Sequence, residues 1–207
     1  MTKFVDSLGL KRLVTKIAEA VKNGTWLPVR KGKGQQAVEE GMGTASGSYS
    51  HAESNATASG DGSHAEGDDT AANGVFSHSE GGSTIASGNY SHVEGRQAEA
   101  NGENSHAEGY FTMASGENSH AEGNQTTASE INSHAEGDNT TASGSDSHAE
   151  GSGTTASGSD SHAEGFGTTA TGQASHAQGC YNYDNPSFID MVGIGDGDET
   201  NQNASVI

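Results

Sequence analysis

Thr140 to Gly151 reads Thr-Thr-Ala-Ser-Gly-Ser-Asp-Ser-His-Ala-Glu-Gly, and this stretch recurs with small variations from Gly41 to about Gly179. All ten histidines fall on one frame of the repeat, 14 residues apart after a first step of 13. An alanine stands six residues before every histidine, and an acid stands two residues after nine of them. A short fixed period of this kind is typical of a solenoid, in which each repeat contacts only its neighbours.

The repeat divides into two halves that read as short strands. Side chains alternate between the two faces of a strand, so Ser147 and Ala149 share one side and His148 takes the other with its glutamate. A coil this short has room only for small side chains, so the Ser/Thr and Ala columns are expected inside and the glycines at the corners. The sequence therefore predicts an all-β solenoid of about ten 14-residue coils, a rod roughly 45–50 Å long.

The composition excludes a conventional globular core. Only 29% of the 207 residues are hydrophobic and 5% are aromatic, and the formal charge is −19. Such values favour disorder, but regular repetition argues against it. The histidine–acid pair recurs in every coil, whereas an enzyme needs one unusual constellation in a cleft. We therefore expect no enzymatic activity, no catalytic residues and no cofactor.

Charge is distributed unevenly along the chain. Residues 1–40 hold eight of the nine basic residues against four acids, whereas residues 41–207 hold 24 acids against one base, a balance of −23. This surface should repel nucleic acid and anionic membranes. No secretory signal and no 18-residue apolar span is recognisable, so no membrane insertion is expected. Cys180 is the only cysteine, which excludes an intrachain disulfide.

The first 24 residues predict a short amphipathic α-helix. Apolar residues recur at three- and four-residue spacings over residues 4–22, and Asn23-Gly24 provides a stop. We expect this helix to serve attachment or oligomerisation through Leu10, Leu13, Ile17 and Val21. Residues 25–40 look like a linker, 41–179 form the repeat shaft, and 180–207 are expected to be a C-terminal cap or transition segment.

Ser-His-Ala-Glu-Gly alternating with Thr-Ala-Ser-Gly at period 14 resembles the head repeats of YadA-like trimeric adhesins, over about 140 residues. The resemblance implies a left-handed parallel β-roll, with three rolls packed around a threefold axis. In that family the motif is typically Ser-Val-Ala-Ile-Gly, so His148 occupies the Val position and Glu150 the Ile position. Because these positions face neighbouring subunits in the family, the resemblance implies an inter-subunit ladder made of His64, Glu66, His78, Glu80, His92, Glu94, His106, Glu108, His120, Glu122, His134, Glu136, His148, Glu150, His162 and Glu164.

Related repeat arrays also occur in phage fibres, so the resemblance implies a structural trimeric fibre protein in one of two settings. We expect a bacteriophage virion fibre, tail or head, because neither a secretory signal nor a membrane-anchoring C-terminal barrel is recognisable. Its partners would be two further copies, other virion proteins bound through the N-terminal region, and a host cell-surface receptor. The alternative is the head of a bacterial trimeric autotransporter adhesin at the cell surface.

Two minor alternatives come from the repeated side chains. A threefold axis could gather histidines for a transition metal, but each glutamate offers a simpler hydrogen-bond acceptor for the ring N–H of its histidine. Ice binding would use Thr pairs in register at 140–141, 154–155 and 168–169.

Overall fold

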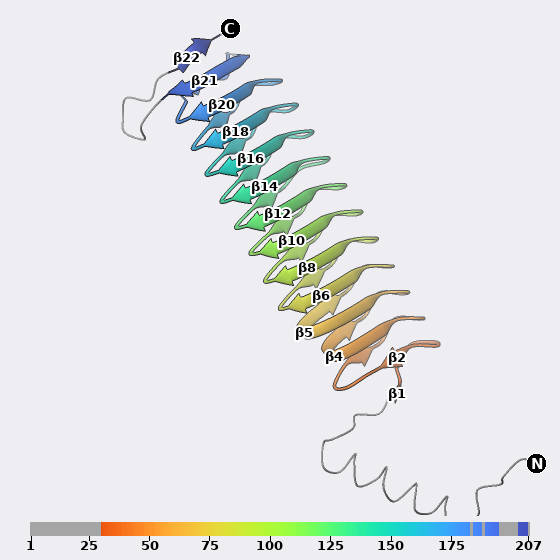
Figure 1. Cartoon of the computed structure of the whole chain (residues 1–207). Coiled ribbons are helices and arrows are strands. Elements are labelled where there is room, and N and C mark those ends of the chain that lie inside the picture. Colours follow the sequence, from red (N-terminus) through yellow and green to blue (C-terminus); the bar gives the residue numbers. More distant parts are fainter. Residues whose placement is uncertain (1–29, 183, 188, 195–202, 207) are drawn as a thin grey trace, which may run out of the picture.

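The computed structural model describes residues 30–182, 184–187, 189–194 and 203–206. This part of the chain is an all-β parallel solenoid of about eleven turns at a spacing of about 14 residues (Figure 1). The prediction of an all-β repeat rod is confirmed, with about one turn more than the ten expected. The predicted helix, with Leu10, Leu13, Ile17 and Val21, lies outside the described residues. Within them no helix is present that could cross a membrane.

Most turns contribute one longer strand that starts at the histidine and one two-residue strand that ends at the alanine. The longer strands are β4 (His51–Ala58), β5 (His64–Ala72), β6 (His78–Gly82), β8 (His92–Arg96), β10 (His106–Tyr110), β12 (His120–Asn124), β14 (His134–Asp138), β16 (His148–Ser152), β18 (His162–Phe166), β20 (His176–Cys180) and β21 (Asp190–Ile194). The two-residue strands are β2 (Val38–Glu39), β3 (Thr44–Ala45), β7 (Ile85–Ala86), β9 (Glu99–Ala100), β11 (Met113–Ala114), β13 (Thr127–Ala128), β15 (Thr141–Ala142), β17 (Thr155–Ala156) and β19 (Thr169–Ala170).

Neighbouring turns pair in parallel with identical positions opposite each other. In β10 and β12, for example, His106 pairs with His120 and Glu108 with Glu122. The strands at the two ends break this pattern, since β1 (Arg30–Lys31) pairs antiparallel with β2 and β22 (Asn203–Val206) pairs antiparallel with β21. The parallel register places every repeated side chain in a straight column along the rod.

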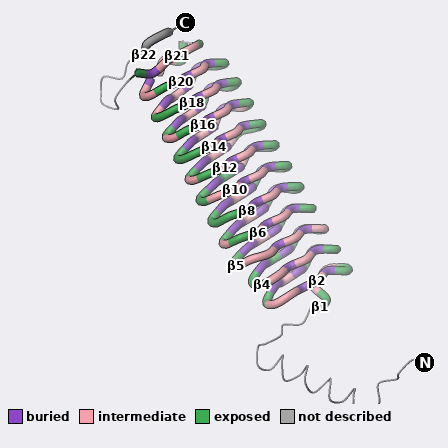
Figure 2. Tube along the Cα trace, viewed as in Figure 1, coloured by how far each residue is buried: buried purple, intermediate pink, exposed green. Residues whose placement is uncertain are grey.

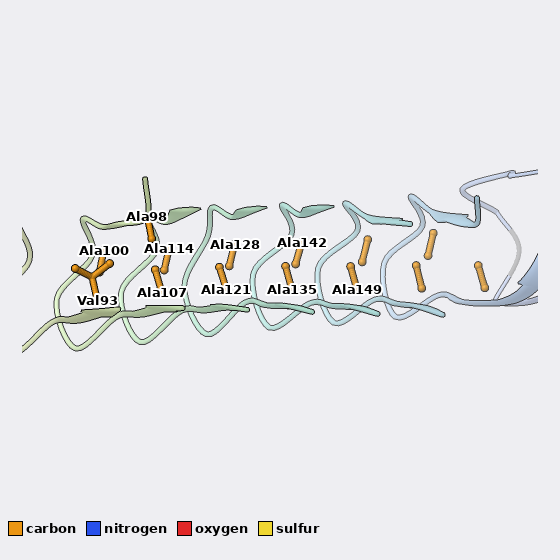
Figure 3. Packing of buried hydrophobic residues seen from close by; sticks show 14 of the residues in the cluster. Val93, Ala98, Ala100, Ala107, Ala114, Ala121, Ala128, Ala135, Ala142 and Ala149 are labelled. Carbon is orange, nitrogen blue, oxygen red and sulfur yellow. The ribbon is translucent and has the colours of Figure 1, made fainter. Parts of the chain in front are cut away.

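The interior of the rod is lined by small side chains, as the alternation predicts. Two alanine columns, the serine before each histidine and the first threonine of each Thr pair are buried, while the residues between them face outward (Figure 2). The alanines of the two strand layers point toward each other across the narrow core (Figure 3). Serines such as Ser147 donate their hydroxyl to the carbonyl three residues earlier, here Gly144 at 2.6 Å, so burial leaves this group hydrogen-bonded.

Two turns vary the core composition in a compensated way. Val93 replaces the usual alanine, and the position five residues later is Ala98 instead of threonine. One turn earlier Ser79 replaces the alanine, and its hydroxyl lies 2.9 Å from the hydroxyl of Thr84, so these two positions face each other. The Val93 turn therefore keeps its core volume by a paired change, whereas the Ser79 turn gives its extra hydroxyl a hydrogen-bond partner in the usual threonine.

The corners follow the glycine prediction only in part. The glycine three residues after the histidine has φ between 100° and 117° in every turn from Gly67 to Gly179, and a Cβ on Gly123 would lie 2.2 Å from the carbonyl oxygen of Gly137. Two further corner positions in each turn are also left-handed, but many of them hold other residues, such as Tyr90 (φ 58°) and Asn118 (φ 56°). Asn tolerates this conformation at low cost, whereas Tyr does not, so packing must hold it there.

The ends of the array refine the predicted boundaries. Val38 pairs with His51, so strand pairing with the solenoid begins within residues 25–40, which the sequence assigned to a linker. The 13-residue first step is absorbed between β4 and β5, where Asn55 pairs with Asp68 and Ala56 with Thr70. At the other end β21 extends the parallel array and Met191 is fully buried, so a larger side chain closes the last turn of the core.

Candidate functional site

The outward face of the longer strands carries a continuous column of stacked imidazoles. The ten rings from His51 to His176 follow each other at centroid distances of 4.7–5.1 Å, and all but the last pair lie within 5° of parallel. The spacing is the distance between parallel strands, because each ring sits on the same position of its turn. All the predicted ladder residues from His64 to Glu164 are thereby placed on one face.

A column of nine carboxylates runs beside the rings. It starts at Glu53, ends at Glu164 and is continued by Gln178. With the neighbouring glycine column these side chains line a long groove of about 1280 Å³ along the rod. The glycines leave the groove open, since they place no side chain beside the carboxylates.

The glutamates do not satisfy the histidine ring nitrogens as expected. The Nε2 atoms lie 3.4–4.0 Å from the nearest carboxylate oxygen in the ion pairs from His64 to His176. Only His51 Nε2 forms a hydrogen bond, with Glu40 at 3.3 Å. In the other nine histidines Nε2 is buried and has no hydrogen-bond partner among the described residues. The rings stack at the strand spacing, and these nine Nε2 atoms find no carboxylate in hydrogen-bonding geometry. Their hydrogen-bonding capacity is therefore unused within the described residues.

Crowding changes the protonation of both columns. Burial, followed by repulsion from the histidines above and below, lowers the pKa of His78, His106, His134 and His162. Hydrogen bonds with the flanking glutamates raise the pKa of Glu80, Glu122 and Glu150 to about 7. The same hydrogen bonds lower the pKa of Glu108 and Glu136. These pKa shifts favour the neutral form of those four imidazoles, and they favour protonation of Glu80, Glu122 and Glu150 up to about pH 7.

Several neighbouring donors lie close enough to share one metal ion. Glu66, His78 and Glu80 form such a set, in which the ligand atoms lie within 4.8 Å of one another, and at least four comparable sets occur along the face. The arrangement combines one or two imidazole nitrogens with one or two carboxylates, a donor set that suits zinc, nickel or copper.

The threonine array is narrower than the sequence suggested. Thr140, Thr154 and Thr168 are buried, and only the second residue of each pair faces outward. In turns nearer the N-terminus the outward column changes to Ile85, Glu99 and Met113. A flat double row of threonines, as ice binding would require, is therefore absent from the described residues.

An aromatic corner was missed by sequence reasoning. Tyr49, Phe76 and Tyr90 stand two residues before their histidines and are exposed by 60%, 60% and 56%. The rings of Phe76 and Tyr90 stack at 5.8 Å. The same column continues as Asn104, Asn118 and Asn132, linked by side-chain hydrogen bonds of 3.2 Å. The shared frame relative to the histidines was the signal that could have identified this corner.

Comparison with protein families agrees with the repeat geometry. The model of the YadA head domain repeat matches two copies, over residues 107–129 and 135–161. No curated protein matches the chain in sequence. The matched residues include the histidine, the glutamate and both alanines of the solenoid turn. Within residues 107–161 the chain therefore carries YadA head domain repeats, a structural repeat that is surface-exposed on adhesins.

Proposed function

We propose that this chain is a non-enzymatic, adhesin-type fibre head that assembles as a homotrimer and is displayed at a bacterial cell surface. The family match carries the proposal, because it covers the turns in which the solenoid is most regular. It favours the adhesin over the virion fibre that was expected from the sequence. The host receptor and the attachment role of the N-terminal region remain predictions.

A single rod would gain stability by packing against further copies. Its core consists mostly of Ala, Ser and Thr, so each turn buries little apolar area to offset the entropy of ordering 14 residues. Packing of rods side by side would add burial. A closed threefold arrangement would give all copies the same interface.

We propose the histidine–glutamate face as the surface that the copies share. From His64 to His176 the Nε2 atoms have no hydrogen-bond partner in the part of the chain that the structure describes, and the side chains of this face are half-buried. In the resembling family the equivalent positions face neighbouring subunits. Partner groups that reach Nε2 would then supply the missing hydrogen bonds, and the repeated spacing would fix the register between chains.

Light scattering on the full 207-residue chain tests the assembly. A trimer has a mass near three times 21.0 kDa, whereas a mass near 21.0 kDa would overturn the proposal. Glu122→Lys with Glu136→Lys should dissociate the trimer, because four-carbon cationic side chains would be forced into the shared face. The matched control is Glu103→Lys with Glu117→Lys, which makes the same charge change at an exposed corner. A trimer that tolerates both pairs would place the interface on another face.

A further inference from the structure

The histidine–glutamate face offers repeated nitrogen and oxygen ligand atoms, and Nε2 of the nine histidines from His64 to His176 has no hydrogen-bond partner among the described residues. Glu80, His92 and Glu94 present three ligand atoms within 4.8 Å of one another, and the two carboxylates come from adjacent turns. Identical sets surround His78 and His106. Each set therefore recurs with the period of the solenoid, and its geometry is fixed by strand pairing, not by a loop.

The rings present a nitrogen that no other described residue engages. An imidazole binds a metal through a ring nitrogen that is not already a hydrogen-bond partner. From His64 onward Nε2 has no hydrogen-bond partner among the described residues. Metal binding at these nitrogens would therefore break no hydrogen bond.

The carboxylates supply the complementary charge. Glutamates of adjacent turns lie close together, since Glu66 and Glu80 bring carboxylate oxygens within 4.8 Å of each other. A divalent cation between two such carboxylates would offset their mutual repulsion. One imidazole with two carboxylates and water is a three-ligand open site of the kind that zinc occupies.

We propose that the histidine–glutamate face is a linear array of transition-metal sites, each formed by one histidine and the glutamates of two adjacent turns, that takes up Zn²⁺, Ni²⁺ or Cu²⁺. Consecutive sets share a carboxylate, as Glu80 is shared by the sets of His78 and His92. With nine carboxylates and two for each ion, the array holds about four ions per chain. Some sets contain two histidines, such as His134, Glu136 and His148, but these parallel rings are stacked 4.7 Å apart and cannot both place a nitrogen about 2.1 Å from one ion. Each ion therefore binds one imidazole.

The donor sets lie within one chain, so the array does not rest on the trimer. Copies that pack through this face would bring three carboxylate columns together, and bound ions would then lower their mutual repulsion. Metal binding and assembly are separable by measuring native mass with and without a chelator. Zn²⁺ binding by a monomer would support the metal array and refute the trimer. A trimer that does not bind Zn²⁺ would support the assembly and refute the metal array.

Calorimetric titration of Zn²⁺ into the metal-free full chain at pH 7.5 tests the array. We expect saturation at about four ions per chain, and at least tenfold weaker binding of Ca²⁺, which prefers sites built from oxygen alone. A variant with three consecutive rings replaced should bind one or two ions fewer: His106→Gln, His120→Gln and His134→Gln. The matched control changes the exposed corner of the same three turns and should bind as the wild type does: Asn104→Ser, Asn118→Ser and Asn132→Ser.

The array is refuted by absence of saturable Zn²⁺ binding, by an unchanged number of ions in the triple histidine variant, or by equal affinity for Ca²⁺. Electron paramagnetic resonance of the unmodified chain loaded with Cu²⁺ gives a second measurement that needs no variant. We expect hyperfine coupling to one imidazole nitrogen per copper. A spectrum with oxygen ligands alone would show that the carboxylates bind ions without the histidines, and would overturn the proposed sites.

Discussion

Because the core is narrow, we expect two substitutions that face each other within one turn to have coupled effects on the free energy of unfolding. Ala121 and Thr126 occupy the positions that Val93 and Ala98 hold two turns earlier, and both are fully buried. Ala121→Val adds two methyl groups opposite a full-sized threonine, so overpacking should cost about 2 kcal/mol. Thr126→Ala alone removes a methyl group and a buried hydroxyl that has no partner, for a cost of about 1 kcal/mol.

The double variant reproduces the natural pair of Val93 and Ala98, so it should lose about 1 kcal/mol of unfolding free energy. The sum of the two single variants would be about 3 kcal/mol. A coupling of about 2 kcal/mol corresponds to a difference of roughly 4–8 °C in melting temperature for a chain of this size. Thermal unfolding followed by circular dichroism measures it. Ala121→Val combined with Thr140→Ala, one turn away, is the control and should be additive. A coupling below about 0.5 kcal/mol in the Ala121/Thr126 pair would refute the compensation.

Three other predictions concern the carboxylates and the corners. The raised pKa of Glu122 gives stability that is present below pH 4.5 and lost as the pH rises through about 7, whereas glutamine stays neutral and keeps a hydrogen-bonding group. Glu122→Gln should therefore melt about 2–4 °C above wild type at pH 8.5 and at the same temperature as wild type at pH 4.5. The control Glu117→Gln, at an exposed position, should show no such pH dependence. The expected gain is about 1 kcal/mol after solvent screening, and an equal change at both pH values would contradict it. Gly123→Ala should cost about 3 kcal/mol or more in thermal stability, because its Cβ would meet the next turn, while Gly82→Ala, with open space around its Cβ, should be within about 1 kcal/mol of wild type. Asn118→Ala and Asn118→Gly both lose the two side-chain hydrogen bonds, but alanine is also less suited to φ 56°, so its melting temperature should fall further than that of the glycine variant. Equal falls would show that the hydrogen bonds alone matter.

Much of the fold could be predicted because one short pattern is repeated. Period two within each half assigns Ala142 and Ala149 to the inside, and the 14-residue period sets which residues form columns. The histidine–glutamate face follows from the same rule. The alternation within a strand and the 14-residue period involve residues that are close in sequence. Both features can therefore be predicted without knowing any distant contact.

Other features depended on distances between turns. Nearly every turn offers a glutamate for its histidine, but the carboxylate oxygens lie 3.9 Å from Nε2 of His120 and 4.0 Å from Nε2 of His134, beyond hydrogen-bond reach. The repeat pattern does not specify those distances. The left-handed corners at Tyr90 and Asn118 were also hidden, because the residue type at this position varies from turn to turn and tyrosine does not favour a positive φ, so the surrounding turns impose the backbone. Sequence thus determined the columns and their chemistry, through periodicity. Tertiary structure alone decided which atoms of those columns meet, because the spacing of parallel strands sets how closely equal side chains approach.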